Sequence, residues 1–482
     1  MNLKTLIKGV EVERIYNDKN IFISSIHSDS REVKKNSLFV AIRGEKLDGN
    51  NYIKQAINLR AKVIIFEGTC DTNQVGIVFI KVKDTRQAVA LVARNFYKNP
   101  SSKIKLIGIT GTNGKTTIAT SLFSITKALG YHSALISTIE NKIDSKTFEA
   151  KNTTPDSISI NKFLNNALQK KCKFVFMECS SHAVDQKRTY GLNFTGGVFT
   201  NLTRDHLDYH KTFKNYIEAK KGFFDQLPSE SFALVNKDDK NSDVMLKNTK
   251  ASKHYFSLDN KSEFVGKIVN QDLGGFNLAV NGEKIFSSFL GRYNAYNILG
   301  IYGVCLLLGL PKKKVIGCIA KLKPPAGRLE FHKSKNGVYG IVDYAHTPDA
   351  LLNVLKTLDG VRGKQSKIIT VVGCGGDRDK TKRPIMGEIA TKFSDFVVFT
   401  SDNPRSEIPE IIINEITNNL KKNNYQKITD RKKAIKKAVK LAKKGDAVLI
   451  AGKGHENYQI FKNKTVHFSD MEELENNFKG TN

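Results

Sequence analysis

The chain has 482 residues, 40% of them hydrophobic, and its 77 Lys and Arg against 47 Asp and Glu give a formal net charge of +30. At about 150 residues per domain, this length predicts about three domains, and the hydrophobic fraction excludes a disordered chain. The longest uncharged apolar run, residues 298–310, is shorter than the roughly 20 residues that a membrane span needs.

The N-terminal segment, MNLKTLIKGVEVERIYNDK, meets charged residues too early for a secretory signal. We therefore expect a cytoplasmic protein that does not insert into a membrane. None of the cysteines forms a C-x-x-C pair and several lie in apolar runs, which favours buried thiols over disulfides or a zinc site. They are Cys70, Cys172, Cys179, Cys305, Cys318 and Cys374.

The positive charge has two interpretations. One is a basic face that binds nucleic acid, and the other is a lysine-rich background combined with an anionic substrate. The lysines are spread along the chain, without a basic tail or an RNA-binding motif that alternates basic and aromatic residues. The second interpretation is therefore favoured, and no nucleic-acid partner is expected.

Residues 1–102 contain strand-like runs at 37–42 and 61–66, a helical stretch at 85–97 and a plausible linker at 99–102. A strand is predicted at 104–109, followed by the loop in GITGTNGKTT (108–117) and a helix at 116–129. Strand, glycine-rich loop and helix in this order are typical of a P-loop, although Ile109 stands where the motif has its first glycine. Lys115 would reach the β and γ phosphates of a nucleotide, and Thr116 would offer its hydroxyl to Mg²⁺.

Strands are also predicted at 174–177, 197–200 and 233–236, and after a break at 322–327 they recur at 340–342, 368–372, 396–400 and 447–450. Strands that alternate with helices indicate a mostly parallel α/β sheet. The predicted fold is α/β with three domains, at 1–102, 103–326 and 327–482. The central domain is P-loop ATPase-like and the last is a separate, Rossmann-like α/β domain.

Polar motifs follow several of these strands, where the ligand crevice of an α/β sheet lies. Glu178 and His206 could serve a Mg²⁺ ion, although a single histidine more often has a structural role. In the last domain the turn-rich segments 343–348, 373–383, 402–405 and 452–456 combine arginines with acids. They suit a small ligand that carries both carboxylate and ammonium groups, whereas each segment alone could be a solvated loop with a salt bridge.

Taken together, these motifs resemble those of the Mur ligase family over nearly the whole chain. In chain order they are DSR (29–31), GTNGKTT (111–117), NTTP (152–155), ECSSH (178–182), NLTRDHLDYH (201–210), GRYNAYN (291–297), GRLE (327–330), DYAHTPDA (343–350), GCGGDRD (373–379), DNPR (402–405) and GKGHE (452–456). The distal glycine missing from the P-loop is also absent from the family's own version, TGTNGKT. The segment 45–49 falls where the family's contacts to sugar and uracil vary.

The resemblance implies an ATP-dependent ligase that uses Mg²⁺ and adds meso-diaminopimelate to UDP-N-acetylmuramoyl-L-alanyl-D-glutamate. DNPR is similar to the family's mark of meso-diaminopimelate selection. An N-terminal domain for the UDP-substrate, a central domain for ATP and a C-terminal domain for the amino acid are implied as well. We expect the enzyme to be a monomer.

The family's functional residues carry over to matching positions of this chain. Lys115, Lys220 and His206 would be catalytic. Lys220 would carry a carbamate formed from CO₂; the adjacent Lys221 is distinguished from it by the spacing of four residues from Tyr216. The implied ATP-binding residues are Gly111, Thr112, Asn113, Gly114, Lys115, Thr116, Thr117, Asn294, Asn297, Arg328 and Asp343.

The other implied sites bind the UDP-substrate, the amino acid and metal. Ser30 would contact the uridine end of the UDP-substrate. The remaining UDP-substrate residues are Asn152, Thr153, Thr154, Ser180, Gln186 and Arg188. The diaminopimelate residues are Arg378, Asp402, Asn403, Pro404, Arg405, Gly452 and Glu456. The metal ligands are Thr116, Glu178, His206 and Lys220.

Three alternatives remain beside this interpretation. DNPR and GCGGDRD argue against related ligases, such as the lysine-adding or folylpolyglutamate enzymes. A nucleic-acid-dependent ATPase has only the net charge in its favour. A catalytically inactive relative is disfavoured because Lys115, Glu178, His206 and Lys220 are all present. For Arg405 the competing role is a salt bridge to Glu407 or Glu410.

Overall fold

The structure, a computed structural model, describes residues 1–44, 47–272, 274–325 and 327–479, with Leu207 and Asp208 described by their backbone only. Part of the segment 45–49, Ala326 at the predicted second domain boundary, and residues 480–482 lie outside the described residues. The chain divides into two compact units, Met1–Glu263 with Gly300–Pro311, and Phe264–Leu299 with Lys312–Asn482. The division falls inside helix α10 (Arg292–Leu307).

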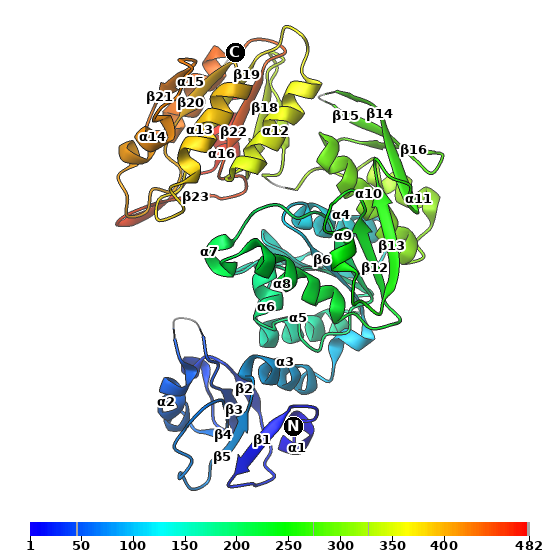
Figure 1. The fold of residues 1–482 in the computed structure, drawn as a ribbon, viewed down its shortest axis with the longest axis vertical. Coiled ribbons are helices and arrows are strands. Elements are labelled where there is room, and N and C mark those ends of the chain that lie inside the picture. Colours follow the sequence, from blue (N-terminus) through cyan, green and yellow to red (C-terminus); the bar gives the residue numbers. More distant parts are fainter. Residues whose placement is uncertain (45–46, 273, 326, 480–482) are drawn as a thin grey trace. The chain divides into compact units, whose positions relative to one another are not determined.

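The N-terminal part of the first unit is a five-stranded sheet in the order β1-β5-β4-β3-β2 (Figure 1). Only β1 runs antiparallel to its neighbour. Side chains of β4 alternate between two cores, with Val63 and Ile65 on one face of the sheet and Ile64 and Phe66 on the other. The elements are α1 (Leu3–Leu6), β1 (Val12–Tyr16), β2 (Ser25–His27), η1 (Ser30–Glu32), β3 (Ser37–Val40), η2 (Gly49–Tyr52), α2 (Ile53–Asn58), β4 (Ala61–Phe66), β5 (Val78–Val82), α3 (Thr85–Phe96) and η3 (Pro100–Lys103).

The central part of the first unit has strands in the order β13-β12-β11-β6-β10-β7-β8-β9. Strands β13 to β7 in this order pair in parallel, whereas β8 and β9 are antiparallel. The elements are β6 (Lys105–Thr110), α4 (Lys115–Ala128), β7 (Ser133–Ile136), β8 (Glu140–Ile143), β9 (Lys146–Glu149), α5 (Ser157–Gln169), β10 (Phe174–Glu178), α6 (Ser181–Asp185), β11 (Gly196–Phe199), α7 (Leu207–His210), α8 (Phe213–Asp225), β12 (Phe232–Asn236), α9 (Ser242–Met245) and β13 (Ser252–Ser257). Because β6 lies between β10 and β11, the loops that follow these three strands meet at one edge of the sheet.

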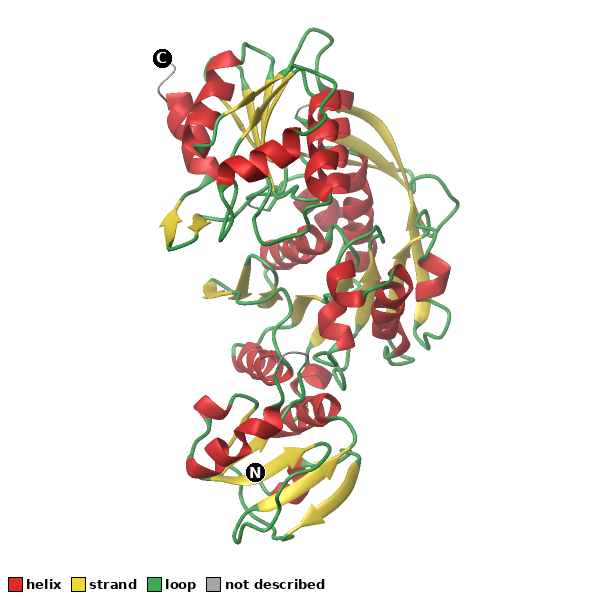
Figure 2. Ribbon diagram, turned by 60° about the vertical axis from the view of Figure 1, so that its left-hand side comes forward, coloured by secondary structure: helices red, strands yellow, loops and turns green. Residues whose placement is uncertain are grey.

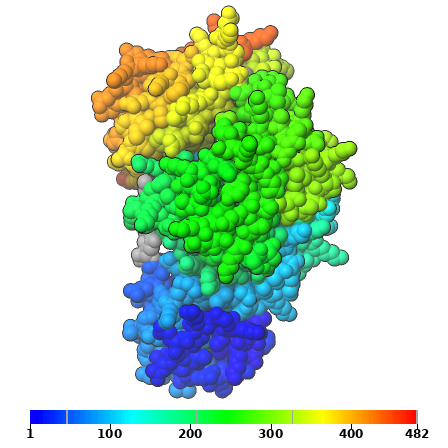
Figure 3. Space-filling view, turned by 45° about the vertical axis from the view of Figure 1, so that its right-hand side comes forward, coloured from blue at the N-terminus to red at the C-terminus, as the bar shows by residue number. Residues whose placement is uncertain are grey.

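Helix α3 of the N-terminal part packs against α5 of the central part, so the two parts join along these helices within one unit. In the space-filling view the dark-blue and light-blue segments form one continuous surface (Figure 3).

The second unit contains an antiparallel meander, β14-β15-β16, and a six-stranded sheet in the order β17-β18-β22-β19-β20-β21. Within the six-stranded sheet only β17 is antiparallel to its neighbour. The elements besides α10 are β14 (Phe264–Asp272), β15 (Gly275–Val280), β16 (Glu283–Ser287), α11 (Lys312–Ile319), β17 (Glu330–Lys333), β18 (Tyr339–Asp343), α12 (Pro348–Val361), β19 (Ile368–Val372), α13 (Lys382–Phe393), β20 (Phe396–Phe399), α14 (Pro409–Thr417), β21 (Tyr425–Lys427), α15 (Arg431–Leu441), β22 (Ala447–Ala451), β23 (Tyr458–Phe461), β24 (Lys464–His467) and α16 (Asp470–Lys479).

Strands β19 and β22 are buried throughout because helices cover both faces of this sheet, as Figure 2 shows. On β22, Leu449 lies in the core that α12, α13 and α14 share, whereas Val448 and Ile450 lie in the core of α15 and α16. The same alternation along β19 places Val372 in the first core and Val371 in the second. Such strands are stable only as the middle layer of an α/β sandwich.

The predicted α/β class, with mostly parallel sheets in three domains, is confirmed. The strands predicted from the sequence correspond to β3, β4, β6, β10, β11, β12, β18, β19, β20 and β22, and the helix at 85–97 corresponds to α3. The domain limits at 102 and 326 remain predictions. The sequence reasoning did not identify the β14–β16 meander or the β23–β24 hairpin.

Most of the apolar run 298–310 lies in α10, which ends at Leu307 and whose side chains are mostly buried. Among the helices that the structure describes, none combines the length and the apolar character needed to cross a membrane. Cys172, Cys179 and Cys374 are buried as expected, whereas Cys70 and Cys318 are partly exposed because they lie in a surface loop and on helix α11.

Candidate functional site

The phosphate loop, residues 111–114 between β6 and α4, has the geometry of an anion site. Its backbone has positive φ angles at Gly111 (142°) and Gly114 (89°). A Cβ atom on Gly111 would lie 1.9 Å from the Thr200 hydroxyl oxygen, so only glycine fits there. Helix α4 begins at Lys115, directly after the loop, and directs its N-terminal N–H groups and dipole toward it. This arrangement favours a bound phosphate.

The segment after β11 holds the phosphate loop in place. Thr200 Oγ1 donates to the carbonyl of Asn113 (2.6 Å), and Asn113 N donates to Asn201 Oδ1 (3.0 Å). Thr112 N donates to the Asn201 carbonyl (2.9 Å), and Thr112 Oγ1 donates to the Thr203 carbonyl (3.2 Å). The loop is therefore preorganised by the start of the motif NLTRDHLDYH.

Two lysines converge on the carbonyl of Gly111. Lys115 Nζ donates to it over 2.9 Å and also to the Thr112 carbonyl over 2.8 Å. Lys220 Nζ, from α8, donates to the same Gly111 oxygen over 2.8 Å. The structure thus places the amine of Lys220 beside the phosphate loop, although more than a hundred residues separate the two in the sequence.

The structure also separates Lys220 from its neighbour Lys221. Lys220 is 1% exposed, and burial, together with the nearby charge of Lys115, lowers the pKa of its ammonium well below its ordinary value. Lys221 instead pairs with Asp225 at 2.5 Å. Of these two lysines, Lys220 is the one that lies next to the phosphate loop. Its lowered pKa favours the neutral amine, which is the form that reacts with CO₂.

The predicted metal ligands lie around this loop. Glu178 ends β10, next to β6, is fully buried and accepts two hydrogen bonds from Thr138, at 2.8 Å from the backbone N and 3.1 Å from Oγ1. Burial lowers the pKa of His206 to about 4, which keeps its ring neutral and able to bind a metal. Thr116 stands in the first turn of α4.

No cluster of three or more His, Cys, Asp or Glu suited to a metal occurs among the described residues. A single carboxylate, a hydroxyl and an imidazole nevertheless fit Mg²⁺, because this ion commonly takes one or two protein ligands and completes its shell with phosphate oxygens and water. The donor set is therefore suited to a magnesium ion that arrives with a nucleotide.

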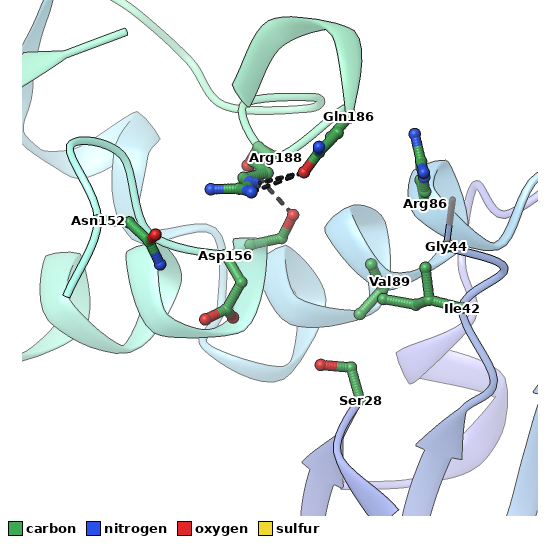
Figure 4. Close-up of a pocket in the computed structure, with 10 residues that line it drawn as sticks. Ser28, Ile42, Gly44, Arg86, Val89, Asn152, Asp156, Gln186 and Arg188 are labelled. Atoms are coloured by element: carbon green, nitrogen blue, oxygen red, sulfur yellow. Dashed lines mark hydrogen bonds between the residues drawn. The ribbon is translucent and has the colours of Figure 1, made fainter. Parts of the chain in front are cut away.

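A cavity of about 390 Å³ lies between the N-terminal and the central part of the first unit and is lined by residues of both (Figure 4). Its lining combines the predicted residues Asn152, Gln186 and Arg188 with residues that the sequence reasoning did not select. The latter are Ser28, Ile42, Gly44, Arg86, Val89, Asp156 and Ser157.

Two arginines make this cavity suited to an anionic ligand. Arg188 donates to the Thr154 carbonyl (2.7 Å) and to Gln186 Oε1 (2.6 Å from Nη2), so its position is determined by neutral groups. Burial lowers the pKa of Arg188, the charge of Asp156, which also lines the cavity, opposes this effect, and the charge of Arg86 adds to it. An anion would relieve the repulsion between the two guanidinium groups.

The remaining predicted UDP-substrate residues lie around the end of β10, with one exception. Thr154 Oγ1 donates to the Glu178 carbonyl (2.7 Å) and accepts from Ser180 N (3.0 Å). Thr153 Oγ1 accepts from Thr138 Oγ1 (3.1 Å). Ser30 is the exception, because its hydroxyl is buried and donates to Gln55 Oε1 (2.7 Å) outside the cavity lining.

Four predicted ATP-binding residues belong to the second unit. Asn294 and Asn297, on α10, are both buried and joined by a 2.8 Å hydrogen bond. The Arg328 guanidinium lies 4.9 Å from the centre of the Tyr344 ring. Burial raises the pKa of Asp343 to about 6, and its carboxylate accepts from Leu329 N (2.7 Å).

Among the described residues, the buried Nε of Arg328 has no hydrogen-bond partner. A buried donor without a partner is costly, so a ligand oxygen is the natural group to satisfy it.

The predicted diaminopimelate residues gather where β19, β20 and β22 end. Asn403 Nδ2 donates to Glu456 Oε2 (2.8 Å), and Gly376 N donates to the Asn403 carbonyl (2.9 Å). Gly452 has a φ of 119°, and a Cβ there would lie 2.7 Å from Asp402 Oδ2. Pro404 is buried, whereas Arg378 is exposed beside Gly375.

Arg405 has a φ of 51° in the left-handed region, which is unusual for a residue with a side chain. Its Nη1 donates to the Gly376 carbonyl (2.8 Å). Glu407, a partner proposed by the salt-bridge alternative, pairs instead with Arg383 (2.9 Å). The hydrogen bonds of the Arg405 guanidinium go to the neutral carbonyl oxygens of Gly376 and Asn403. Its positive charge is therefore suited to a ligand carboxylate.

Sequence reasoning missed three buried cations near these loops. Arg383 bonds Glu407 and the Gly375 carbonyl, Arg431 bonds Asp470 and the Ala451 carbonyl, and Lys453 bonds Asn403 and Glu456. Two of them had a signal, since Lys453 lies inside GKGHE and Arg383 ends the turn-rich segment 373–383. Arg431 lies in a lysine-rich helix that resembles a solvated surface, so no pattern distinguished it.

Comparison with known proteins extends over most of the chain. Residues 109–305 match the Mur ligase middle domain, and residues 327–454 match the Mur ligase glutamate ligase domain. Residues 22–97 match the Mur ligase family, catalytic domain.

The chain is 48% identical to the UDP-N-acetylmuramoyl-L-alanyl-D-glutamate–2,6-diaminopimelate ligase of Phocaeicola vulgatus, over 99% of each chain. It is 42% identical to such a ligase of Clostridium acetobutylicum, over 98% of each chain. A solved structure described as this ligase matches with a TM-score of 0.73 and 29% identity, covering 100% of this chain and 99% of the other. MurF from Acinetobacter baumannii, at 17% identity and a TM-score of 0.65 over 99% and 98% of the two chains, shares the fold.

Proposed function

This chain belongs to the Mur ligase family, and we propose that it is the ATP-dependent ligase that joins meso-diaminopimelate to UDP-N-acetylmuramoyl-L-alanyl-D-glutamate during peptidoglycan precursor synthesis. The observation that carries the proposal is the 48% identity to a ligase of that name over 99% of each chain. The site geometry supports it, because a phosphate loop, an anion-binding cavity and a cluster for an amino acid are all present.

The proposed reaction has two steps. The γ-phosphoryl group of ATP is transferred to the γ-carboxylate of the D-glutamate residue, which gives an acyl phosphate and ADP. The amine of diaminopimelate then attacks the acyl carbon, the amide bond forms, the amine loses a proton and phosphate leaves. Activation is needed because a free carboxylate is a poor acyl donor, whereas phosphate is a good leaving group.

The residues of the phosphate loop act by position and charge. Backbone N–H groups of residues 111–114 bind phosphate oxygens, and the ammonium of Lys115 neutralises the charge that builds up during phosphoryl transfer. Asn294, Asn297, Arg328 and Asp343 bind the rest of the nucleotide. Holding the two reacting groups in one orientation supplies much of the rate.

Thr116, Glu178 and His206 would hold Mg²⁺, which neutralises phosphate charge when bound. Lys220 reacts as a neutral amine with CO₂ and releases a proton. The resulting carbamate places an anion beside the phosphate loop, where the protonated lysine would be a cation. The lowered pKa of the Lys220 ammonium and its burial support this proposal, since only the neutral amine adds CO₂.

The cavity with Asn152, Gln186 and Arg188 binds the muramoyl-dipeptide portion of the UDP-substrate, together with Thr153, Thr154 and Ser180. Ser30 is proposed for the uridine end, where its hydroxyl oxygen can accept a hydrogen bond while it donates to Gln55. In the second unit Arg378 and Arg405 bind a diaminopimelate carboxylate, and Asp402, Asn403, Gly452 and Glu456 bind its ammonium. We propose further that the enzyme is a cytoplasmic monomer.

The test is phosphate release with ATP, Mg²⁺, bicarbonate and UDP-muramoyl-L-Ala-D-Glu, with meso-diaminopimelate or L-lysine added in parallel. Release that depends on diaminopimelate is expected. Release with lysine alone would retain the family but replace the amino acid. No release with either would overturn the proposed substrates.

A further inference from the structure

Lys453 is a buried cation within the cluster that the proposed function assigns to the amino acid, and no role has been given to it above. Its side chain is fully buried. Its Nζ donates to Asn403 Oδ1 and to Glu456 Oε2, at 3.1 Å each, and lies 3.7 Å from Asp402 Oδ1. We propose that Lys453 is a positioning residue that sets the charge and the free acceptor atoms of the diaminopimelate ammonium site. This inference rests on the proposed function.

Lys453 joins two loops that come from different strands. It follows β22 in GKGHE, and its ammonium reaches Asp402 and Asn403, which follow β20 in DNPR. Asn403 Oδ1 also accepts from Ile460 N (3.0 Å), and Asn403 Nδ2 donates to Glu456 Oε2. Asn403, Lys453 and Glu456 are therefore joined by hydrogen bonds, and Asp402 is added to this cluster by its ion pair with the ammonium of Lys453.

The charges of this network match one ligand ammonium. Asp402 and Glu456 carry two negative charges and Lys453 carries one positive charge, so the cluster has a net charge of −1. One ammonium group neutralises it. Without Lys453, the buried Asp402 and the partly buried Glu456 would face a single ammonium, and one negative charge would stay uncompensated in a largely dehydrated site.

Lys453 also determines which oxygens the ligand can use. It approaches Glu456 at Oε2 and Asp402 at Oδ1, and Asn403 Oδ1 already accepts two hydrogen bonds. Asp402 Oδ2 lies close to Gly452, where a Cβ atom would come within 2.7 Å of it, so glycine keeps a side chain away from this oxygen. The ligand ammonium is thereby directed to Asp402 Oδ2 and Glu456 Oε1, and this orientation fixes where the neighbouring carboxylate points.

The first experiment compares Lys453→Met with the wild type in steady-state ligation. Removing one member of a buried charged network should raise KM for meso-diaminopimelate by roughly 30-fold or more. KM for ATP and for the UDP-substrate should stay within about twofold. Lys436→Met, at an exposed lysine of the same unit, is the matched control and should change none of the three. An equal rise in all three KM values in Lys453→Met would overturn the proposal.

A double-mutant cycle with Glu456→Gln separates positioning from a general effect on folding. If Lys453 acts through Glu456, Lys453→Met should raise KM for diaminopimelate much less in the Glu456→Gln background than in the wild type. Equal effects in both backgrounds would contradict the proposal. If Lys453→Met does not fold, Lys453→Gln replaces it, because its amide can still hydrogen-bond to Asn403 without carrying charge.

A direct measurement of diaminopimelate binding tests the role of Lys453 independently of the proposed reaction. In calorimetric titration of the full chain, meso-diaminopimelate should bind the wild type. Its affinity for Lys453→Met should be lower by roughly 30-fold, the factor expected for KM. Binding without ligation in the wild type would refute the proposed reaction while leaving the role of Lys453 intact. Equal affinity for both proteins would refute the role of Lys453 alone.

Discussion

Single residues carry the chemistry that this fold positions, and Lys220 is the clearest case. Its amine is buried, shares the Gly111 carbonyl with Lys115 and has a lowered pKa. Lys221 differs from it only by one position, yet it forms an ordinary ion pair with Asp225. One helical step of about 100° is enough to separate a buried amine beside the phosphate loop from an ion-paired lysine.

We expect Lys220→Gln to lose at least about 100-fold in ligation rate, because a neutral amide supplies neither the carbamate nor its charge. In wild-type protein equilibrated with ¹³C-bicarbonate, NMR should show a carbamate resonance that is absent from Lys220→Gln. Lys221→Gln is the matched control and should retain both the resonance and most of the activity. A resonance that persists in Lys220→Gln and disappears in Lys221→Gln would place the carbamate on Lys221 and contradict the assignment to Lys220.

Arg405 is the proposed determinant of the amino-acid substrate. Its fork can bind the distal carboxylate of diaminopimelate with two hydrogen bonds, whereas lysine would leave it without that partner. Arg405→Ala should therefore raise KM for diaminopimelate by roughly 100-fold and leave KM for ATP nearly unchanged. Kinetics of Arg362→Ala, which removes an arginine paired with Asp359 and Asp395, provide the comparison. A similar rise of KM for diaminopimelate and of KM for ATP in Arg405→Ala would rule out this assignment.

At the scale of elements, the amino-acid cluster depends on how the ends of parallel strands are tied together. Arg383, in α13, links the loop after β19 to Glu407, and Arg431, at the start of α15, donates to the Ala451 carbonyl at the end of β22 (3.0 Å). Both side chains are fully buried. These bonds hold loops that the strands alone would leave free to move.

The Arg383–Glu407 pair predicts a pH-dependent contribution to stability. Hydrogen bonding to Arg383 lowers the pKa of Glu407 to about 2. A lowered pKa stabilises the folded state above the unfolded value of about 4.5, and this stabilisation is lost as the pH falls toward 2. Glu407→Gln should therefore cost roughly 2 kcal/mol at pH 7 and progressively less below about pH 4.5.

Urea unfolding of wild type and Glu407→Gln between pH 7 and pH 3.5 measures this contribution. Glu410→Gln is the matched control, because Glu410 is exposed, whereas the ion pairs of Arg383 are with Glu407 and Glu415. A difference between wild type and Glu407→Gln that stays constant down to pH 3.5 would show that the charge of Glu407 is not responsible.

For the whole molecule, the net charge of +30 has an interpretation tied to the substrates. ATP and the UDP-substrate are both anionic, and a basic protein attracts them over distances of about 10 Å at moderate salt. The charge exceeds what one site needs, so non-specific binding of polyanions is expected at low salt. Duplex DNA should then bind weakly, lose affinity steeply as salt rises and leave ATP turnover unchanged. DNA-stimulated ATP hydrolysis at 150 mM salt, measured as phosphate release, would contradict this expectation.

The sequence was sufficient for the features that local pattern controls. Apolar runs such as 368–372 and 447–450 identify buried strands, since only the middle layer of a sandwich has no polar face. A glycine-rich loop that is followed by Lys115 and a helix specifies a phosphate site, because backbone N–H groups and a helix N-terminus are local properties. The family resemblance rested on the order of short motifs and was confirmed over the full length of the chain.

Tertiary structure decided what depends on atoms distant in the sequence. Ser30 points to Gln55, Arg86 enters the lining of the cavity, and Lys453 rather than an isolated carboxylate lies at the centre of the amino-acid cluster. None of these follows from periodicity, because burial and hydrogen-bond partners are set by packing between elements. The sequence by itself determined the fold class, the phosphate loop and the family, since these are written in local patterns. Only the three-dimensional arrangement decided which charges become buried and which atoms they leave open to a ligand, because the energy of a charge depends on what surrounds it.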